Sequence, residues 1–130
     1  MRFPTIPIVQ AHCDLPCGVY DPAQARIEAQ SVKAIIEKYE GNDDPAFRSR
    51  ALQIKEERSD LVKHHLWVLW TDYFKPPHFE KYPQLHQLFN EATKLAGAGG
   101  TKGSTDVKVA DQLLDKIDEI SEIFWETKKA

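Results

Sequence analysis

Two cysteines and a histidine lie close together near the start of the 130-residue chain, in the sequence His12-Cys13-Asp14-Leu15-Pro16-Cys17-Gly18. A pair of thiolates beside an imidazole is typical of a soft-metal site or a redox site. Cys13 and Cys17 are the only cysteines of the chain, and the turn-forming residues Pro16 and Gly18 would allow both thiolates to face one centre. We therefore expect the chemistry of this chain to be concentrated in this segment.

The identity of the remaining ligands decides which metal this segment could hold. A tetrahedral zinc site needs four side-chain ligands, and only His12, Cys13 and Cys17 are local. If the chain were cleaved between Ala11 and His12, the new α-amine and a deprotonated backbone amide could join the two thiolates. Two nitrogens and two thiolates in a plane suit nickel or copper, with the imidazole left to bind axially. A disulfide between the two cysteines is the alternative in an oxidising compartment.

The first eleven residues, Met1–Ala11, differ in kind from the rest of the chain. They contain Pro4 and Pro7 among small apolar residues. Pro7 interrupts the apolar core of about 7–15 residues that a secretory signal needs. We interpret Met1–Ala11 as a leader or a disordered arm, not as an export signal, and we expect a cytoplasmic protein.

Composition excludes several classes of partner. The net charge of -3 and the pI near 5.9 give no basic surface for nucleic acid. No apolar run approaches the roughly 18 residues that span a bilayer. A length of 130 residues with 42% hydrophobic residues is ordinary for one globular domain. We expect neither a nucleic-acid nor a membrane partner.

Four amphipathic helices are predicted downstream, and nothing alternates convincingly with period two. The first begins at Asp21-Pro22, and a second runs from about Pro45 to Phe74, where Lys75-Pro76-Pro77 stops it. A third begins near Pro83, and a fourth begins near Thr105 after a glycine-rich loop over 97–104. The predicted stripe of the first helix is Ala25, Ala29, Val32, Ile36 and Tyr39. The predicted seam of the second is Phe47, Ala51, Ile54, Arg58, Leu61, His65, Val68 and Asp72. The fold class is therefore all-α, a four-helix bundle over 21–130 with an N-terminal metal-binding hook over 12–20.

Several conspicuous side chains have ordinary explanations. No histidine has a glutamate three residues before it, so His64 and His65 are predicted to be structural rather than di-iron ligands. The aromatic cluster of Trp67, Trp70, Tyr73 and Phe74 is predicted to be core or subunit interface. Arg58, placed in an apolar seam, either extends its charge to water or pairs with an acid, for which Glu28 is the natural partner.

The motif from His12 to Gln24 resembles the N-terminal nickel hook of the nickel superoxide dismutase family. The resemblance covers essentially the whole chain after Ala11, and further matching segments are 41–45, 72–83 and 123–130. It implies a four-helix bundle that assembles as a homohexamer and binds one nickel ion per subunit. It also implies that superoxide is the substrate and is disproportionated to oxygen and hydrogen peroxide by Ni(II)/Ni(III) cycling.

Carried over by residue, the resemblance implies that His12 gives its α-amine and an axial imidazole to nickel. Cys13 would give a thiolate and its backbone amide, and Cys17 the second thiolate. Because His12 here follows Ala11 in peptide linkage, we expect Met1–Ala11 to be removed on maturation by a protease.

The resemblance also assigns residues around the metal. Tyr20 would stand over the open face and limit what approaches, and Glu28 with Arg58 would hold the axial imidazole. The loop over 96–106 carries no signature that predicts a function. Two other classes stay open at this point: a protein that stores or delivers nickel or copper, and a structural helical oligomer with a disulfide.

Overall fold

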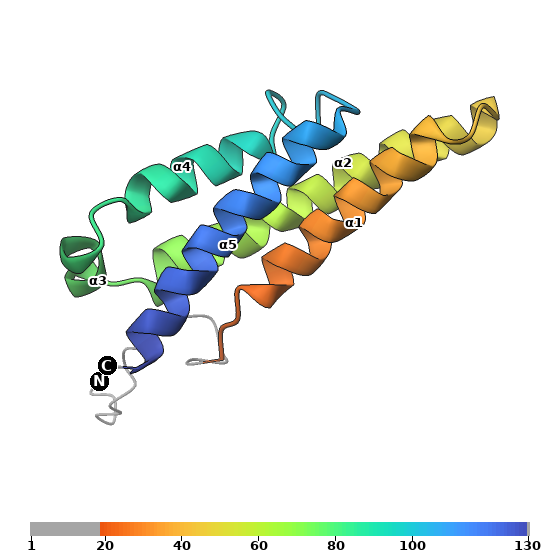
Figure 1. Cartoon of the computed structure of the whole chain (residues 1–130). Coiled ribbons are helices and arrows are strands. Elements are labelled where there is room, and N and C mark those ends of the chain that lie inside the picture. Colours follow the sequence, from red (N-terminus) through yellow and green to blue (C-terminus); the bar gives the residue numbers. More distant parts are fainter. Residues whose placement is uncertain (1–18, 130) are drawn as a thin grey trace, which may run out of the picture.

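The protein is all-α in the computed structural model, which describes residues 19–129. In chain order the elements are α1 (Ala23–Glu40), α2 (Pro45–Val68), the π-helical turn η2 (Leu69–Tyr73), α3 (Pro76–Lys81), α4 (Leu85–Leu95) and α5 (Val107–Lys129). The four longer helices lie alongside one another, and the described residues contain no strand (Figure 1). The predicted four-helix bundle is confirmed.

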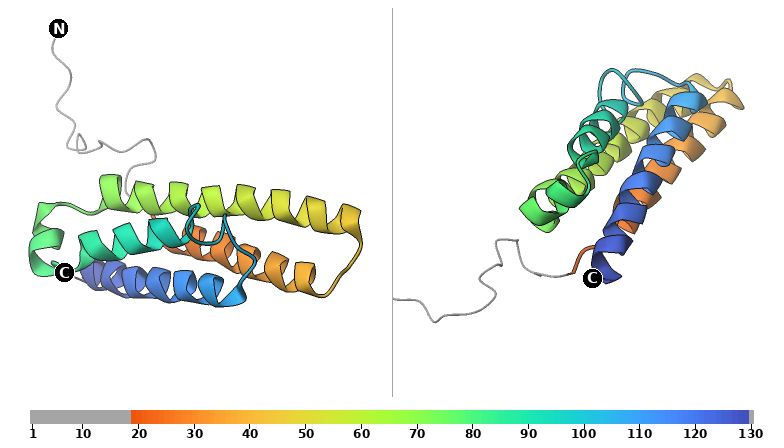
Figure 2. Two further views of the ribbon diagram at one scale, coloured as in Figure 1. Left: turned by 90° about the horizontal axis from the view of Figure 1, so that it is seen from above. Right: turned by 60° about the vertical axis from the view of Figure 1, so that its left-hand side comes forward.

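The bundle is uneven along its length. The hairpin of α1 and α2 extends beyond α4 and α5 at one end (Figure 2), and α4 is only 11 residues long. The start of α1, the end of α5, η2 and α3 lie together at the opposite end. The residues that follow the hook in sequence therefore enter the bundle where three other segments meet.

The two helices of the hairpin begin as their sequences predict. The Asp21 carboxylate accepts a hydrogen bond from the Ala23 amide at 2.9 Å, and the Asp44 carboxylate accepts one from Phe47 at 3.0 Å. In α1 the buried side chains belong to the predicted stripe, which are Ala25, Ala29, Val32 and Ile36. This stripe sets the register in which α1 packs against α2 and α5.

The predicted seam of α2 is wrong by one residue after Ala51. The buried positions are Lys55, Ser59, Val62, Leu66 and then Leu69, so Arg58 is exposed rather than interior. The burial of two polar side chains, Lys55 and Ser59, is the cause of the error. A search for apolar residues at helical spacing misses buried positions that are occupied by polar residues. The partners of these polar residues lie far away in the sequence.

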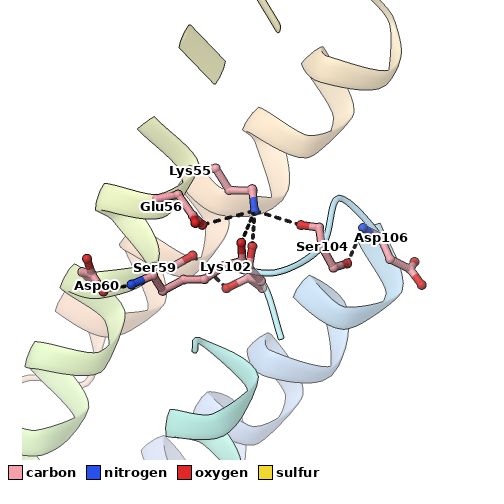
Figure 3. A network of polar contacts seen from close by, with 8 residues as sticks. Lys55, Glu56, Ser59, Asp60, Lys102, Ser104 and Asp106 are labelled. Atoms are coloured by element: carbon pink, nitrogen blue, oxygen red, sulfur yellow. Dashed lines mark hydrogen bonds and ion pairs between the residues drawn. The ribbon is translucent and has the colours of Figure 1, made fainter. Parts of the chain in front are cut away.

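Those partners belong to the loop between α4 and α5 (Figure 3). The Lys55 ammonium donates to the carbonyl of Thr101, to that of Ser104 at 2.9 Å and to that of Lys102 at 3.2 Å. The Ser59 hydroxyl lies 2.8 Å from the Thr101 hydroxyl. The glycine-rich loop is thus held to the middle of α2 by a buried charge and by a pair of hydroxyl groups.

The end of α2 also differs from the prediction of one continuous helix to Phe74. The last turn widens to a π-helix, in which the Phe74 amide donates to the Leu69 carbonyl at 3.0 Å. Pro76 and Pro77 do not merely stop α2, because they form the first turn of the short helix α3. The predicted third helix begins at Leu85, as α4.

The aromatic cluster divides between core and surface. Phe74 is buried among Phe89 and Phe124, and Trp70 stacks on Phe89 with ring centroids 6.2 Å apart. Of the two predicted placements, core or subunit interface, the core is the one observed for Phe74, and Trp70 packs against that core. Trp67 is the member that remains on the surface, with 46% of its area exposed.

Candidate metal centre

The predicted nickel ligands His12, Cys13 and Cys17 lie outside the described residues. Within 19–129, no group of three or more histidine, cysteine, aspartate or glutamate side chains is placed to hold a metal ion. Both thiols of the chain belong to the predicted hook, so soft-metal binding has no other thiolate ligand in this sequence. The donor set of two thiolates with nitrogen ligands fits nickel(II).

Tyr20 is the predicted site residue that lies at the start of the described chain. It is half-buried beside the core, its hydroxyl oxygen is buried, and its ring meets Tyr73 edge-on at 5.6 Å. The segment that leads out of the hook is therefore fixed against the bundle at this ring. This placement puts Tyr20 where the hook joins the helices.

Tyr73 also lies in this region, and the sequence did not predict its position. From the sequence, Tyr73 is recognised only as one of four clustered aromatic residues. It ends η2, its ring lies 4.4 Å from that of Phe124, and it stacks on His78 at 5.7 Å. Its hydroxyl lies 2.7 Å from the Thr127 hydroxyl. The π-helical turn delivers Tyr73 to this position, and turns of this kind are frequent at functional sites.

Glu28 and Arg58 form the ion pair that was predicted. Arg58 Nη1 lies 3.1 Å from Glu28 Oε1 and 3.0 Å from Oε2, which ties α2 to the second turn of α1. The Glu28 side chain is 13% exposed and that of Arg58 is 44% exposed. The pair is confirmed, but it lies at the edge of the bundle and not in the buried seam from which it was inferred.

Histidines elsewhere in the described chain have structural partners. The rings of His64 and His65 meet edge-on at 5.5 Å. Burial lowers the pKa of His65, as does the neighbouring His64, whereas the charge of Glu28 acts in the opposite direction. His86 accepts a hydrogen bond from the Trp70 indole at 3.1 Å and stacks on Phe79.

Positive charge also lies near the two tyrosines. The Lys128 ammonium lies 5.2 Å from the centre of the Tyr73 ring and 5.5 Å from that of Phe124. Lys75 follows Tyr73 by two residues, and its ammonium donates to the Asp72 carbonyl at 2.8 Å. In a chain of net charge -3, such lysines are a local source of attraction for a small anion.

The family model of nickel-containing superoxide dismutase matches residues 7–128. The chain belongs to this family. It is 66% identical over 122 residues to the nickel superoxide dismutases of Streptomyces coelicolor and Streptomyces seoulensis, which covers 94% of this chain and 92% of each relative. Its fold matches a native nickel superoxide dismutase structure with a TM-score of 0.87 and 66% identity, over 92% of this chain and 100% of that chain. A structure with the nickel ligation of the oxidised state matches equally well.

Family membership gives the chain its activity: it is an oxidoreductase, a superoxide dismutase with a nickel cofactor. The resemblance found in the hook motif is thereby confirmed at the level of the whole chain. No helix among residues 19–129 is both long and apolar enough to cross a membrane.

Proposed function

We propose that this nickel superoxide dismutase holds its metal through the α-amine and imidazole of His12, the thiolate and amide of Cys13 and the thiolate of Cys17. The observation that carries the proposal is the absence of any alternative ligand group in 19–129, together with the confinement of both cysteines to the hook motif. Solved relatives support it. Their variants replace a histidine at the first position, an aspartate at the third and a tyrosine at the ninth. His12, Asp14 and Tyr20 have the same types and the same spacing.

The same numbering supports removal of the leader. A histidine in the first position of a solved relative corresponds to His12 here, so Met1–Ala11 would precede the mature chain. The native relative is matched over 100% of its length by 92% of this chain, which leaves unmatched a share about the size of that leader. A maturation protease would cut after Ala11 and create the α-amine that serves as a ligand, and residues 12–130 would form the mature domain.

The residues around the proposed nickel site then each have a defined role. The chemistry supplied by bound nickel is one-electron transfer in both directions, so two superoxide ions and two protons yield oxygen and hydrogen peroxide. Glu28, oriented by Arg58, holds the His12 imidazole in place, as outer ligand partners commonly do. Tyr20, braced by Tyr73, narrows the approach and so limits peroxide oxidation of the thiolates.

The assembly we propose is a homohexamer, with each hook close to a neighbouring subunit. Large apolar side chains remain exposed on the single chain, including Val19 at 70%, Ile27 at 59% and Trp67 at 46%. Val19 and Ile27 lie on either side of the start of α1, so exposed apolar side chains are present close to the end of the hook, as expected of an interface. Sedimentation at micromolar concentration tests the proposal, and a stable monomer of the 14.9 kDa chain would contradict it.

The metal site is tested with a chain that starts at His12, loaded with nickel or, as a control, with zinc, which has no redox chemistry. Superoxide decay should accelerate with nickel and not with zinc, at one nickel per chain. Nickel bound at that ratio without turnover would instead support a storage or delivery protein. We propose a cytoplasmic location, because the site needs reduced thiols and disulfides are rare in that compartment.

A further inference from the structure

We infer that Thr127, near the end of α5, is a positioning residue for the metal site, acting through Tyr73 on Tyr20. The inference rests on the proposed function, because it takes the hook to lie next to Tyr20. Tyr73 meets Tyr20 edge-on at 5.6 Å, and on its other side its hydroxyl lies 2.7 Å from that of Thr127. The three residues come from three separate segments, so each contact links parts of the chain that are distant in sequence.

The direction of the hydrogen bonds follows from counting protons. A threonine hydroxyl has one proton to donate, and a carbonyl oxygen only accepts. Thr127 Oγ1 lies 2.5 Å from the Phe124 carbonyl, so its proton is donated there. The hydroxyl of Tyr73 must therefore donate its own proton to Thr127. The result is a directed chain from Tyr73 through Thr127 to the backbone of α5.

This chain fixes Tyr73 in two ways. The phenolic proton points toward α5, so only lone pairs of the Tyr73 oxygen are left for other partners. The ring also contacts two neighbouring rings: His78 stacks on it at 5.7 Å, and Phe124 lies tilted against it at 4.4 Å. A ring held at its tip and on its face gives Tyr20 a rigid surface. Without the Thr127 hydroxyl, the Tyr73 proton could turn and the ring would lose its anchor.

Thr127→Val tests the inference, since valine keeps the shape and removes the hydroxyl. Thr127→Ser keeps the hydroxyl and should restore function. Thr93→Val is the matched control, because the Thr93 hydroxyl also donates to a helix carbonyl, that of Phe89 at 2.7 Å. Among the described residues, the Thr93 hydroxyl makes no hydrogen bond to a tyrosine. Each substitution is made in the native background, and Thr127→Val also in a Tyr73→Phe background.

Two readouts are needed. The first is kcat/KM for superoxide, with the nickel-loaded chain starting at His12. The second is the near-ultraviolet circular dichroism of the tyrosines in nickel-free full-length protein. Thr127→Val should lower kcat/KM by about threefold to tenfold, the range for one lost hydrogen bond between neutral groups. It should also change the tyrosine signal, and in the Tyr73→Phe background it should have no further effect on either readout.

Three results would overturn the inference: an equal loss in the Tyr73→Phe background, a Thr127→Val protein that matches the native one in both readouts, or a serine variant that behaves like valine. Absence of dismutase activity in the native nickel-loaded protein would contradict the proposed function instead. In that case the nickel-free signal still decides the link, since additive changes from the two substitutions would show that Thr127 does not act through Tyr73.

Discussion

Arg58 donates from a single nitrogen, Nη1, to both carboxylate oxygens of Glu28, at 3.1 and 3.0 Å. The carboxylate is 13% exposed, whereas the arginine side chain is 44% exposed. The exposed Arg58 guanidinium therefore orients the mostly buried Glu28 carboxylate. Because the arginine is exposed and the carboxylate is not, we expect loss of Arg58 to affect stability and activity to different extents.

Arg58→Met should lower the free energy of unfolding by only about 1 kcal/mol or less, because exposed ion pairs contribute little. Activity should fall more, by about tenfold or greater, since partners of metal ligands commonly have effects of that size. Urea unfolding and superoxide decay measure the two effects. Arg26→Met is the matched control, because Arg26 is as exposed as Arg58, at 42%, and pairs with Asp118 at 2.8 Å. Equal activity losses in both variants would contradict a special role for Arg58.

Removal of Met1–Ala11 should be required for activity, because only then does His12 carry a free amine. Full-length protein and protein starting at His12 are each loaded with nickel and compared in the same superoxide assay. The mass of the N-terminus, measured together with nickel per chain, confirms which form is present. Equal activity of the two forms would show that the amine is not a ligand.

Cys13→Ser and Cys17→Ser should each abolish superoxide turnover and leave the bundle folded. Hydroxyl oxygen is a poor donor to nickel beside a thiolate, and the core residues of 19–129 include neither position. Far-ultraviolet circular dichroism of each variant serves as the folding control. A parallel loss of helical signal would show that the cysteines are structural.

Lys55→Met should destabilise the protein by about 2–4 kcal/mol, because it leaves loop carbonyls without their charged donor. Lys55 is 2% exposed and bonds to the carbonyls of Thr101, Lys102 and Ser104. Lys102→Met is the control, since it breaks only a more exposed pair with Asp60 and should cost about 0.5 kcal/mol or less. Faster amide exchange over 97–104 in the Lys55 variant alone would locate the effect, and equal costs in the two variants would contradict it.

Stability should decrease on acidification in a way that depends on His78. Burial, and to a lesser extent Lys75, lower the pKa of His78 from its ordinary value of 6.5. The unfolded chain therefore takes up a proton that the folded chain resists, so the free energy of unfolding falls as pH drops below 6.5. His78 Nδ1 also accepts the Lys75 amide at 3.0 Å, which a proton on that nitrogen would prevent.

His78→Asn keeps an acceptor near Nδ1 and cannot titrate, so its stability should change less between about pH 7.5 and about pH 5. Urea unfolding at both values measures the difference. Part of the dependence should remain, because the pKa of His65 is lowered as well. An unchanged pH dependence in the variant would exclude His78 as a contributor.

The buried faces of helices that consist of apolar residues could be predicted from the sequence. The buried face of α2 that contains polar residues could not. The stripe of α1 contains only apolar residues at the predicted positions, so its buried face was correct. In α2, Lys55 and Ser59 occupy the seam because their partners lie more than 40 residues later, and no local pattern reveals such a contact. The same error put Arg58 in the interior, although its pairing with Glu28 was predicted correctly.

The site divides along similar lines. The hook motif identified the family, because its residue types and spacing are unusual, while the roles of His12, Cys13, Cys17 and Tyr20 stay predictions. Tyr73 could not be placed, since a π-helical turn has no clear composition and shifts every later side chain around the helix axis. Thr127 had no signal of its own, because its importance arises only from a contact 54 residues away.

The meeting of Tyr20, Tyr73 and Thr127 at one end of the bundle restricts how the protein can be labelled. An affinity tag before His12 would block the amine, and a tag at the C-terminal end of α5 would lie close in sequence to Thr127, which contacts Tyr73. Immobilisation or fluorescent labelling is better directed to the turn over 41–44, between α1 and α2, at the far end of the hairpin (Figure 1). A probe attached at this turn would label the protein at the end of the bundle that is opposite to the proposed metal site.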